Sequence, residues 1–465
     1  MRILHAIHDF LPRHRAGSEI YAFALGRELA DTHHVTVLCA EYDPARPDGH
    51  VTWRVHGGLP VAEIVNNWMC RSFEDTYRPP LMTERIRQVL RAVQPDVVHV
   101  HNLLNLSFDL PVLAHQEGSA VVATLHDHSL VCPSGGQRLH QAEEHVCDDI
   151  DTDRCVRCFR ESPFHAQISF GRLAALTGSP GPLYRAAAAG LRRFPMVANR
   201  VASTVRGTAM IDITRTQVDA RLLAARALFA EVDLFVAPSA SMASAFERAG
   251  IGSGKIEISD YGFEPSERSG DNGRRTAGAP LRIGFVGTLV WHKGVHALID
   301  AVRALAPDKY EVKIFGNPDT FPEYTAGLRA RATGQPVRFM GSFDRSEIAG
   351  VYSQIDVLVV PSLWLENSPL VIHEAFMAGV PVVGARIGGI AGLVQDGRSG
   401  LLYDPERPDE LVVALRRLID DPCLLRQLAD GARAVRVKSI ADDAREWEQR
   451  YVRVIERRSA APVSA

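Results

Sequence analysis

The chain lacks several features that would assign it to a class of protein at once. No apolar run is long enough to span a membrane, since the longest uncharged stretches, such as Val357–Leu365 and Ala375–Ala385, fall well short of the ~18 residues that a spanning helix needs. No charge of one sign dominates, because 52 Lys and Arg residues face 55 Asp and Glu residues. This balance excludes a global attraction to nucleic acid, which we do not expect as a partner. The N-terminus has no signal-peptide pattern, and we therefore expect a cytoplasmic protein.

Two residue types are scarce and unevenly used. Lysine supplies only five of the 52 basic residues, so composition alone does not easily explain a lysine in a candidate site. Cysteine occurs seven times, and Cys39, Cys70 and Cys423 are scattered as small buried hydrophobic residues would be. The other four cysteines lie in one window of 27 residues and are Cys132, Cys147, Cys155 and Cys158.

The four clustered cysteines have the spacing of a metal site. Their pattern is Cys-x14-Cys-x7-Cys-x2-Cys, and in a reducing compartment such a cluster favours a metal over disulfides. A closed tetrahedral zinc site with a structural role fits this ligand set best. An unmetallated thiol cluster stays open as the second interpretation, and redox or iron–sulfur chemistry is the third.

Short β-branched runs alternate with helical stretches along the chain. In the first half, the runs of strand length are Arg2–His8, Val35–Cys39, Val97–Val100, Ala120–Leu125 and Leu234–Val236. Near-continuous apolar strands separated by helices predict a parallel sheet covered on both faces. After a polar segment rich in Gly, Pro and Ser, the pattern restarts with runs at Arg282–Val286, Val312–Phe315, Val337–Met340, Val357–Val360 and Val382–Gly384.

The sequence therefore predicts an α/β protein with two doubly wound Rossmann-like domains. The predicted divisions are a first domain at 1–263, a linker at 264–280, a second domain at 281–440 and a C-terminal helix in 441–465. The first domain holds the cysteine-rich loop, 132–158, and a basic insertion, 160–226, in which ten arginines face three acidic residues. This insertion is interpreted either as a solvated helical segment or as a surface that meets anionic lipid.

The strongest motif follows a predicted strand of the second domain. Ser368 suits the N-cap of a helix, and Pro369 suits its first helical position. Glu366 precedes this helix and Glu374 lies within it, so two carboxylates reach one strand end, where open α/β sheets bind their ligands. The backbone amides of the first helical turn, which have no partner within the helix, can bind an anion at the same place. Two unrelated surface glutamates are the alternative.

Two further loops carry candidate site residues. The loop Gly287–Gly294 connects a strand end to the next helix, and its terminal glycines allow close approach of the backbone to a ligand. Lys293 in this loop supplies a positive charge for a phosphate, while the absence of P-loop spacing disfavours ATPase chemistry. In the first domain, Gly17 lies in the turn before the first helix. His126 follows the strand Ala120–Leu125, where it can hydrogen-bond a sugar hydroxyl or satisfy the loop backbone instead.

Together these motifs resemble glycosyltransferase family 4, a family of retaining enzymes with the GT-B fold. The residues that carry the similarity are Gly17, His126 with Asp127, the loop Gly287–Gly294, Glu366 with Glu374 eight positions later, Gly388 with Gly389, and the run Gly400, Leu401 and Leu402. The resemblance implies two domains that face each other across a cleft. It also implies that the nucleotide-sugar donor lies mainly on the second domain and that the C-terminal helix crosses back to the first.

The resemblance implies roles for particular residues. Lys293 would hold the diphosphate, Glu366 would contact the transferred sugar, and Glu374 would accept hydrogen bonds from the ribose. The implied catalytic residues are His126, Lys293 and Glu366. The implied donor-binding residues are Gly17, Gly287, Thr288, Lys293, Phe343, Asn367, Ser368, Pro369, Leu370, Val371 and Glu374. Basic side chains and a helix N-terminus would replace a metal, so no cofactor is expected for catalysis.

The function implied by the resemblance is transfer of a sugar from a nucleotide-sugar donor to a glycan or polyprenyl-linked acceptor, with retention of configuration. Bacterial cell-surface polysaccharide biosynthesis is the expected setting, with peripheral contact at the inner face of the membrane through 160–226. A GT-B-like epimerase or phosphorylase is a weaker enzyme hypothesis. The alternative from another class is a non-catalytic sensor or scaffold, which would bind a sugar nucleotide without hydrolysing it.

Overall fold

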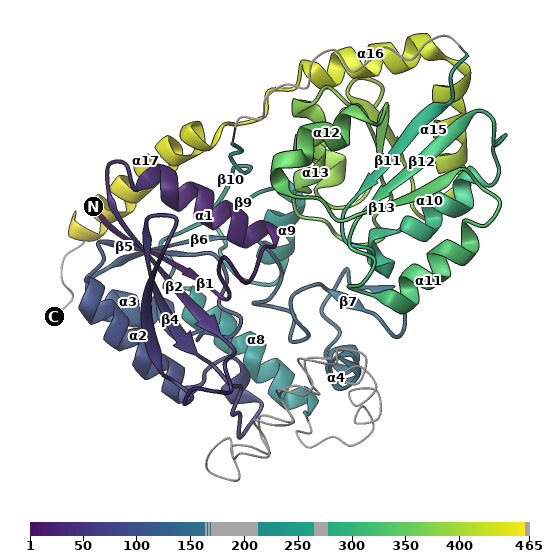
Figure 1. The fold of residues 1–465 in the computed structure, drawn as a ribbon. Coiled ribbons are helices and arrows are strands. Elements are labelled where there is room, and N and C mark those ends of the chain that lie inside the picture. Colours follow the sequence, from purple (N-terminus) through teal and green to yellow (C-terminus); the bar gives the residue numbers. More distant parts are fainter. Residues whose placement is uncertain (163–164, 166–167, 169–212, 265–277, 461–465) are drawn as a thin grey trace. The chain divides into compact units, whose positions relative to one another are not determined.

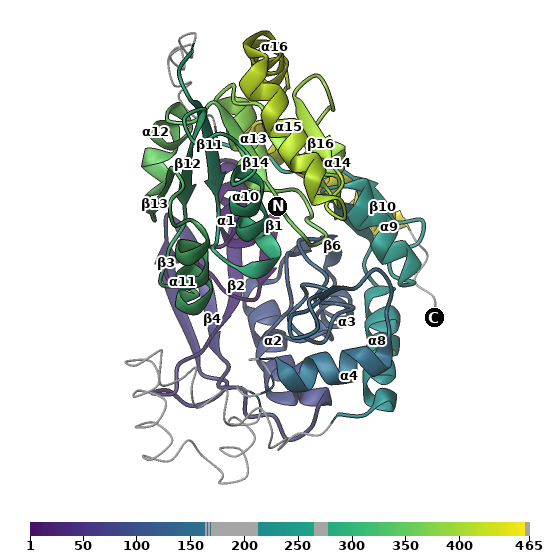
Figure 2. The same ribbon diagram turned by 90° about the vertical axis from the view of Figure 1, so that its right-hand side faces the viewer.

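The computed structural model describes residues 1–162, 165, 168, 213–264 and 278–460, which form two compact units (Figures 1 and 2). The N-terminal unit comprises Met1–Pro238, Met242–Gly262 and Ile440–Ala465, and the C-terminal unit comprises Ser239–Ser241 and Phe263–Ser439. Most of the predicted basic insertion, at 169–212, and most of the predicted linker, at 265–277, lie outside the described residues.

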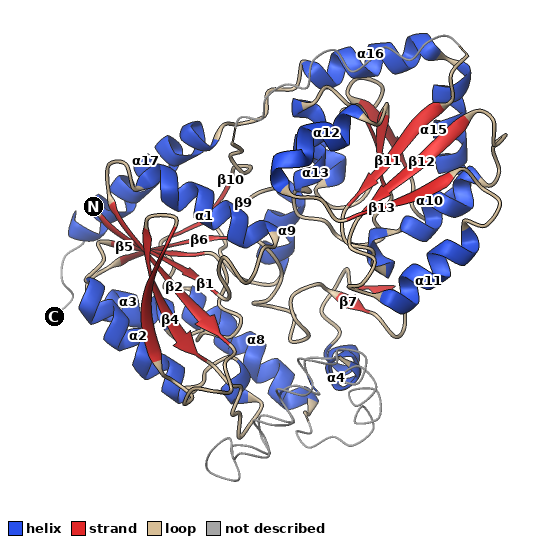
Figure 3. Ribbon diagram, viewed as in Figure 1, coloured by secondary structure: helices blue, strands red, loops and turns tan. Residues whose placement is uncertain are grey.

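An eight-stranded sheet forms the centre of the N-terminal unit (Figure 3). Its strand order is β10-β9-β6-β5-β1-β2-β4-β3, and neighbouring strands are parallel except for β3, which is antiparallel to β4. The strands are β1 (Arg2–Ile7), β2 (His34–Glu41), β3 (Val51–His56), β4 (Leu59–Val65), β5 (Val97–Val100), β6 (Ala120–Thr124), β9 (Leu234–Ala237) and β10 (Ile256–Ile258). The near-continuous apolar strands are thus at the centre of the sheet, as the sequence pattern predicts.

Helices cover both faces of this sheet (Figure 1). Leu4 and Ala6 of β1 pack in one hydrophobic cluster with the apolar residues of α2 and α3. The alternate face of β1, which includes His5, is covered by α1 and α17. Among the residues that the structure describes, the helices of this unit are α1 (Gly17–Leu29), η1 (Glu74–Thr76), α2 (Pro80–Val93), α3 (Leu110–Gln116), α4 (Thr152–Glu161), α8 (Arg215–Phe229), α9 (Ala240–Arg248), which begins in the other unit, and α17 (Ile440–Ala460).

The C-terminal helix α17 is part of the core of the N-terminal unit. It packs against α1 and β6, and Trp447 and Tyr451 are buried there. The indole nitrogen of Trp447 donates to the hydroxyl of Tyr21 at 2.9 Å, and that hydroxyl donates to Asp443 at 2.7 Å. The last helix of the sequence therefore completes the first Rossmann-like unit. Among the residues that the structure describes, no helix is both long enough and apolar enough to cross a membrane.

A six-stranded parallel sheet forms the C-terminal unit, in the order β13-β12-β11-β14-β15-β16. The strands are β11 (Leu281–Val286), β12 (Tyr310–Phe315), β13 (Val337–Gly341), β14 (Val357–Val360), β15 (Val382–Ala385) and β16 (Gly400–Tyr403). The described helices are η2 (Trp291–Lys293), α10 (Val295–Val302), α11 (Pro322–Arg331), η3 (Arg345–Glu347), α12 (Ile348–Ser353), α13 (Leu370–Met377), α14 (Ile390–Leu393), α15 (Pro408–Asp420) and α16 (Pro422–Arg433). Because parallel strands end at one edge, the loops after β11, β14 and β15 are neighbours.

Candidate active site

The loops after β11 and β14 are in direct backbone contact. Gly294 has a φ of +71°, and a β-carbon on it would lie 1.8 Å from the carbonyl oxygen of Pro361. The amide of Leu363 donates to the carbonyl oxygen of His292 at 2.8 Å. Only glycine meets both the conformation and the spacing required at position 294. The glycine at the end of the predicted phosphate loop therefore joins two loops of the site.

This contact places Lys293 beside Glu366. Nζ of Lys293 donates to Oε1 of Glu366 at 2.7 Å, and the hydroxyl of Ser362 donates to the same oxygen at 2.7 Å. The Glu366 side chain is 6% exposed. Burial alone raises the pKa of this carboxyl, but the charge of Lys293 and the hydrogen bonds outweigh burial and hold its pKa below the usual value. Glu366 is therefore an anion at neutral pH and accepts hydrogen bonds.

The loop after β15 closes on the same segment. Gly388 has a φ of +53°, and a β-carbon on it would lie 2.5 Å from the carbonyl oxygen of Glu366. A β-carbon on Gly389 would lie 1.7 Å from the carbonyl oxygen of Asn367, and the amide of Gly389 donates to Glu366 at 2.6 Å. The two glycines thus hold the backbone of Glu366 and Asn367 from the side of β15.

Helix α13 begins one residue later than the sequence predicts. Its first residue is Leu370, and Pro369, with φ −63° and ψ 116°, takes the N-cap position that we assigned to Ser368. The hydroxyl of Ser368 instead lies 2.9 Å from Nε2 of His373. The assignments of Ser368 as N-cap and Pro369 as the first helical residue are therefore wrong, because a local bond to His373 competes for the serine hydroxyl.

Glu374 lies in the second turn of α13 and is 9% exposed. The hydroxyl of Tyr352, from α12, lies 3.1 Å from Oε2 of Glu374 and 3.0 Å from the carbonyl oxygen of Val371, and it donates to both. Tyr352 is a site residue that the sequence analysis missed. It lies 22 positions before Glu374, and no motif marks the contact.

Replacing Tyr352 by phenylalanine is expected to weaken donor binding about 5-fold with little change in kcat, because roughly 1 kcal/mol of carboxylate positioning is lost. Steady-state kinetics with varied donor measures this split. Tyr310→Phe is the matched control, since the Tyr310 hydroxyl donates to Gln335 at 2.7 Å from the first residue of β12. An equal effect in both variants would contradict a role of Tyr352 in the site.

The other predicted donor residues of the second domain lie on the same edge of the sheet. Gly287 directly follows β11, and its amide donates to Phe315 at the end of β12 at 3.0 Å. Phe343 follows β13, and its ring centroid is 6.2 Å from that of Phe315. The structure therefore brings together the candidate residues of one unit, which are Gly287, Thr288, Lys293, Phe343, Glu366, Asn367, Ser368, Pro369, Leu370, Val371 and Glu374.

The two remaining candidates, Gly17 and His126, belong to the N-terminal unit. Gly17 is the first residue of α1. His126 follows β6, with Nε2 3.0 Å from Nδ1 of His101 and Nδ1 2.9 Å from the hydroxyl of Tyr261. Burial, reinforced by the charge of His8, lowers the pKa of His126 to about 3. Its imidazole is therefore neutral, and both nitrogens are engaged within the unit.

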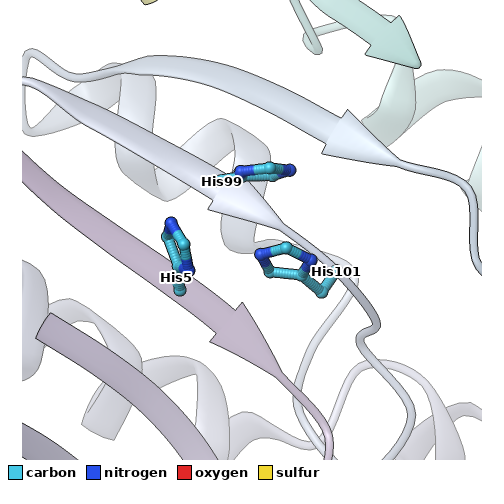
Figure 4. A group of neighbouring side chains, drawn as sticks. All are labelled: His5, His99 and His101. Atoms are coloured by element: carbon cyan, nitrogen blue, oxygen red, sulfur yellow. The ribbon is translucent and has the colours of Figure 1, made fainter. Parts of the chain in front are cut away.

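A cluster of buried histidines lies in the core of the N-terminal unit (Figure 4). His5 on β1 is the register partner of His99 on β5, and His101 follows β5. One ring nitrogen of each histidine lies within 4.8 Å of a ring nitrogen of the other two. Nδ1 of His99 is 2.7 Å from the hydroxyl of Tyr451, and its Nε2 is 2.7 Å from that of Thr124. Burial lowers the pKa of His5 to about 4 and those of His99 and His101 well below the usual value.

These histidines are expected to make the fold sensitive to acid. In the unfolded chain they titrate near pH 6.5, whereas in the fold they stay neutral, so protons bind the unfolded state preferentially as the pH falls. Stability is complete above about pH 6.5 and falls by about 1.4 kcal/mol per buried histidine for each pH unit below it. Thermal melts between pH 8 and pH 5 measure this slope.

A single substitution tests which histidine is responsible. His5→Leu is expected to flatten the acid slope by one proton, because it removes a fully buried imidazole whose pKa is about 4. His34→Gln, at an exposed position, is the control and is expected to leave the slope unchanged. Melting temperatures that stay constant from pH 7 to pH 5 would contradict the assignment of these groups as neutral in the fold.

Two Rossmann-like units, each built on a parallel or mostly parallel sheet, give the chain the architecture of the GT-B fold. Comparison with known families agrees. A family model described as Glycosyltransferase Family 4 matches residues 15–152, and a model described as Glycosyl transferases group 1 matches residues 280–421. The chain thus contains a region that matches each of these two glycosyltransferase family models.

Curated relatives are named glycosyltransferases, and solved structures of low sequence identity share the fold. The D-inositol 3-phosphate glycosyltransferase of Corynebacterium diphtheriae is 35% identical over 182 residues, which is 37% of this chain and 42% of the relative. The chain thus spans less than half of that relative's length. Among solved structures, sucrose-phosphate synthase from Thermosynechococcus elongatus has a TM-score of 0.64 at 18% identity, covering 98% of this chain and 99% of the other. Anabaena HepE in complex with UDP has a TM-score of 0.63 at 17% identity, covering 97% and 100%.

Proposed function

We propose that the chain transfers a sugar from a nucleotide-sugar donor to a glycan or polyprenyl-linked acceptor, with retention of anomeric configuration. The observation that carries this proposal is the ion pair of Lys293 with Glu366 at the carboxyl edge of a parallel sheet, with Glu374 on the adjoining helix. In this pair, the Lys293 ammonium can bind a diphosphate, and the Glu366 carboxylate can accept hydrogen bonds from sugar hydroxyls.

The geometry supports separate tasks for the three side chains. Lys293 stabilises the charge that develops on the leaving diphosphate, which is the main requirement when the sugar departs as an oxocarbenium-like species. Glu366 is ionised, so it accepts hydrogen bonds from the sugar and does not protonate the leaving group. Glu374, oriented by Tyr352, accepts hydrogen bonds from the ribose. Catalysis on this account uses no metal, and the roles of Gly17 and His126 stay predictions.

The choice of donor and acceptor rests on the relatives. Structures of HepE were solved with UDP and with UDP-glucose, which makes a uridine sugar the first donor to test. Curated relatives are named D-inositol 3-phosphate glycosyltransferases, so a phosphorylated cyclitol belongs in the acceptor screen beside lipid-linked glycans. We place the reaction in cell-surface polysaccharide biosynthesis on the cytoplasmic side, with 160–226 as the segment that meets the membrane.

A thermal-shift screen against UDP-, GDP-, ADP- and dTDP-sugars tests donor binding. Ligand at about a hundred times its dissociation constant stabilises the fold by roughly 2.7 kcal/mol, and one nucleotide is expected to give this shift without added metal. Glu374→Gln is expected to reduce the shift. No shift with any of the four nucleotides would contradict the proposed donor class. A shift without any release of nucleoside diphosphate would support the sensor instead.

A further inference from the structure

The segment that carries the four clustered cysteines has little regular structure of its own. After β6 it forms a hairpin of two-residue strands, β7 (Leu139–His140) and β8 (His145–Val146), followed by α4. Helix α4 lies beside α8 in Figures 1 and 2 and contacts it. Leu130, Val131 and Phe159 anchor the segment in the core of the N-terminal unit, while its hairpin strands are only two residues long each. Small substructures of this kind are often held by a cross-link or a metal.

The fold brings the cysteines to one place. Cys155 and Cys158 are three positions apart on α4 and therefore share one face of the helix. The thiol of Cys158 lies 3.6 Å from the carbonyl oxygen of Leu139 on β7. Leu139 is the register partner of Val146, which directly precedes Cys147. Helix and hairpin thus present three cysteines to each other.

The fourth cysteine, Cys132, lies in the loop that follows β6. Its amide donates to the carbonyl oxygen of His128 at 2.8 Å, and Arg221 of α8 donates to the carbonyl oxygens of Ser129 and Leu130 in the same loop. Helix α8 also contacts α4, which carries two of the other cysteines. The loop of Cys132 and helix α4 are thus both held by α8.

The surrounding charges suit a centre with net negative charge. A zinc ion with four thiolates carries a net charge of −2. Arg221 from α8 is buried and donates to the carbonyl oxygen of Leu130, two residues before Cys132. Arg138 is also buried, and its carbonyl oxygen accepts a hydrogen bond from the amide of Cys147 at 2.8 Å. Arginines therefore offset the charge of a metal–thiolate centre.

The histidine cluster of Figure 4 is the competing metal site, and its charges fit poorly. Three neutral imidazoles would leave a dication with its full charge in the core, a costly burial. The charge of Arg450 acts on His99 and adds to that cost, and both nitrogens of His99 already have hydroxyl partners. Hydrogen bonds with Tyr451 and Thr124 satisfy both ring nitrogens of His99, so its burial does not require a metal.

We propose that Cys132, Cys147, Cys155 and Cys158 bind one structural zinc ion that fastens the 126–162 segment to the N-terminal unit. In the described part of the chain, two groups of three possible metal ligands have their ligand atoms within 4.8 Å of one another, His5 with His99 and His101, and His8 with Asp9 and Glu19. Neither group contains a cysteine, so the four thiols are farther apart than in a metal site. Binding therefore requires the four side chains to turn inward to Zn–S distances of about 2.3 Å, with release of their thiol protons to solvent.

Elemental analysis of the purified full-length chain, expressed with added zinc, tests the proposal. One zinc per chain is expected in the wild type and in Cys423→Ser, the control at an exposed cysteine. Cys155→Ser with Cys158→Ser is expected to remove it, whereas His99→Gln is expected to keep it. Zinc retained by the double cysteine variant, zinc lost from His99→Gln, iron in place of zinc, or no metal in the wild type would overturn the proposal.

A measurement on the wild type covers the case in which the double variant does not fold. Thiol modification in the presence of a zinc-sensitive dye is expected to release one zinc as the clustered cysteines react, and a chelator is expected to speed proteolysis within 126–162. Release of zinc without thiol modification, or cleavage that a chelator does not change, would contradict the site. Donor binding by the C-terminal unit is measured separately, so failure of the zinc proposal and failure of the proposed function are distinguishable.

Discussion

Replacing Lys293 by alanine is expected to reduce turnover at saturating donor about 1,000-fold. At ~4 Å and an effective dielectric constant of ~20, an ammonium and a phosphate attract each other by roughly 4 kcal/mol. The effect falls on kcat if the contact strengthens as charge develops on the leaving group. The variant also leaves Glu366, 2.7 Å from Nζ of Lys293 in the wild type, as a buried carboxylate without its cation.

Kinetics of a double-mutant cycle separate these effects. Glu366→Gln alone is expected to lower kcat, and because the two side chains form one ion pair, the double variant is expected to lose less than the sum of the single losses. Lys309→Ala is the control, since Lys309 is an exposed lysine of the same unit. A normal kcat with only a raised KM in Lys293→Ala would contradict its role at the leaving group.

Gly294→Ala is expected to destabilise the C-terminal unit by ~3 kcal/mol or more and to abolish activity. The new β-carbon would lie 1.8 Å from the carbonyl oxygen of Pro361, and because that oxygen is backbone, one of the two loops must move. Moving either loop separates Lys293 from Glu366. Thermal melts and donor turnover on the same preparation measure both losses.

A second glycine provides a matched control for backbone strain. Gly334 has a φ of +76°, close to the +71° of Gly294, but a β-carbon on it would meet nothing within 4 Å. Gly334→Ala is therefore expected to cost about 1 kcal/mol and to leave activity unchanged. If Gly294→Ala and Gly334→Ala lose stability equally, backbone strain at positive φ alone explains the loss. The contact between the loops after β11 and β14 would then not be needed for stability.

Most parallel strands of both sheets could be predicted because they are buried on both faces, although β4, β10 and β16 were not among the predicted runs. Val357–Val360 is apolar throughout, and Val97–Val100 is apolar except for the buried His99; they became β14 and β5 with the predicted bounds. The edge strand β3 was missed, because Trp53 and Val55 are exposed and alternate with polar residues. An exposed edge strand has no continuous apolar run to detect.

The site could be predicted only where its residues are close in sequence. Glu366 and Glu374 belong to one motif, and the strand and helix around them fix their place. Tyr352 and Ser362 contact these glutamates from other positions, and tyrosine or serine alone carries no signal. The predicted start of α13 was one residue too early. The Ser368 hydroxyl forms a hydrogen bond with the His373 side chain and so does not cap the helix N-terminus.

The most direct test of the central claim is release of nucleoside diphosphate from the donor that stabilises the chain, measured without acceptor. Slow hydrolysis is expected in the wild type, because water replaces the acceptor once the leaving group is stabilised. It is expected to be lost in Lys293→Ala and in Glu366→Gln and kept in Lys309→Ala. Hydrolysis that survives both site variants, or donor binding with no release at all, would contradict a glycosyltransferase centre built on Lys293 and Glu366.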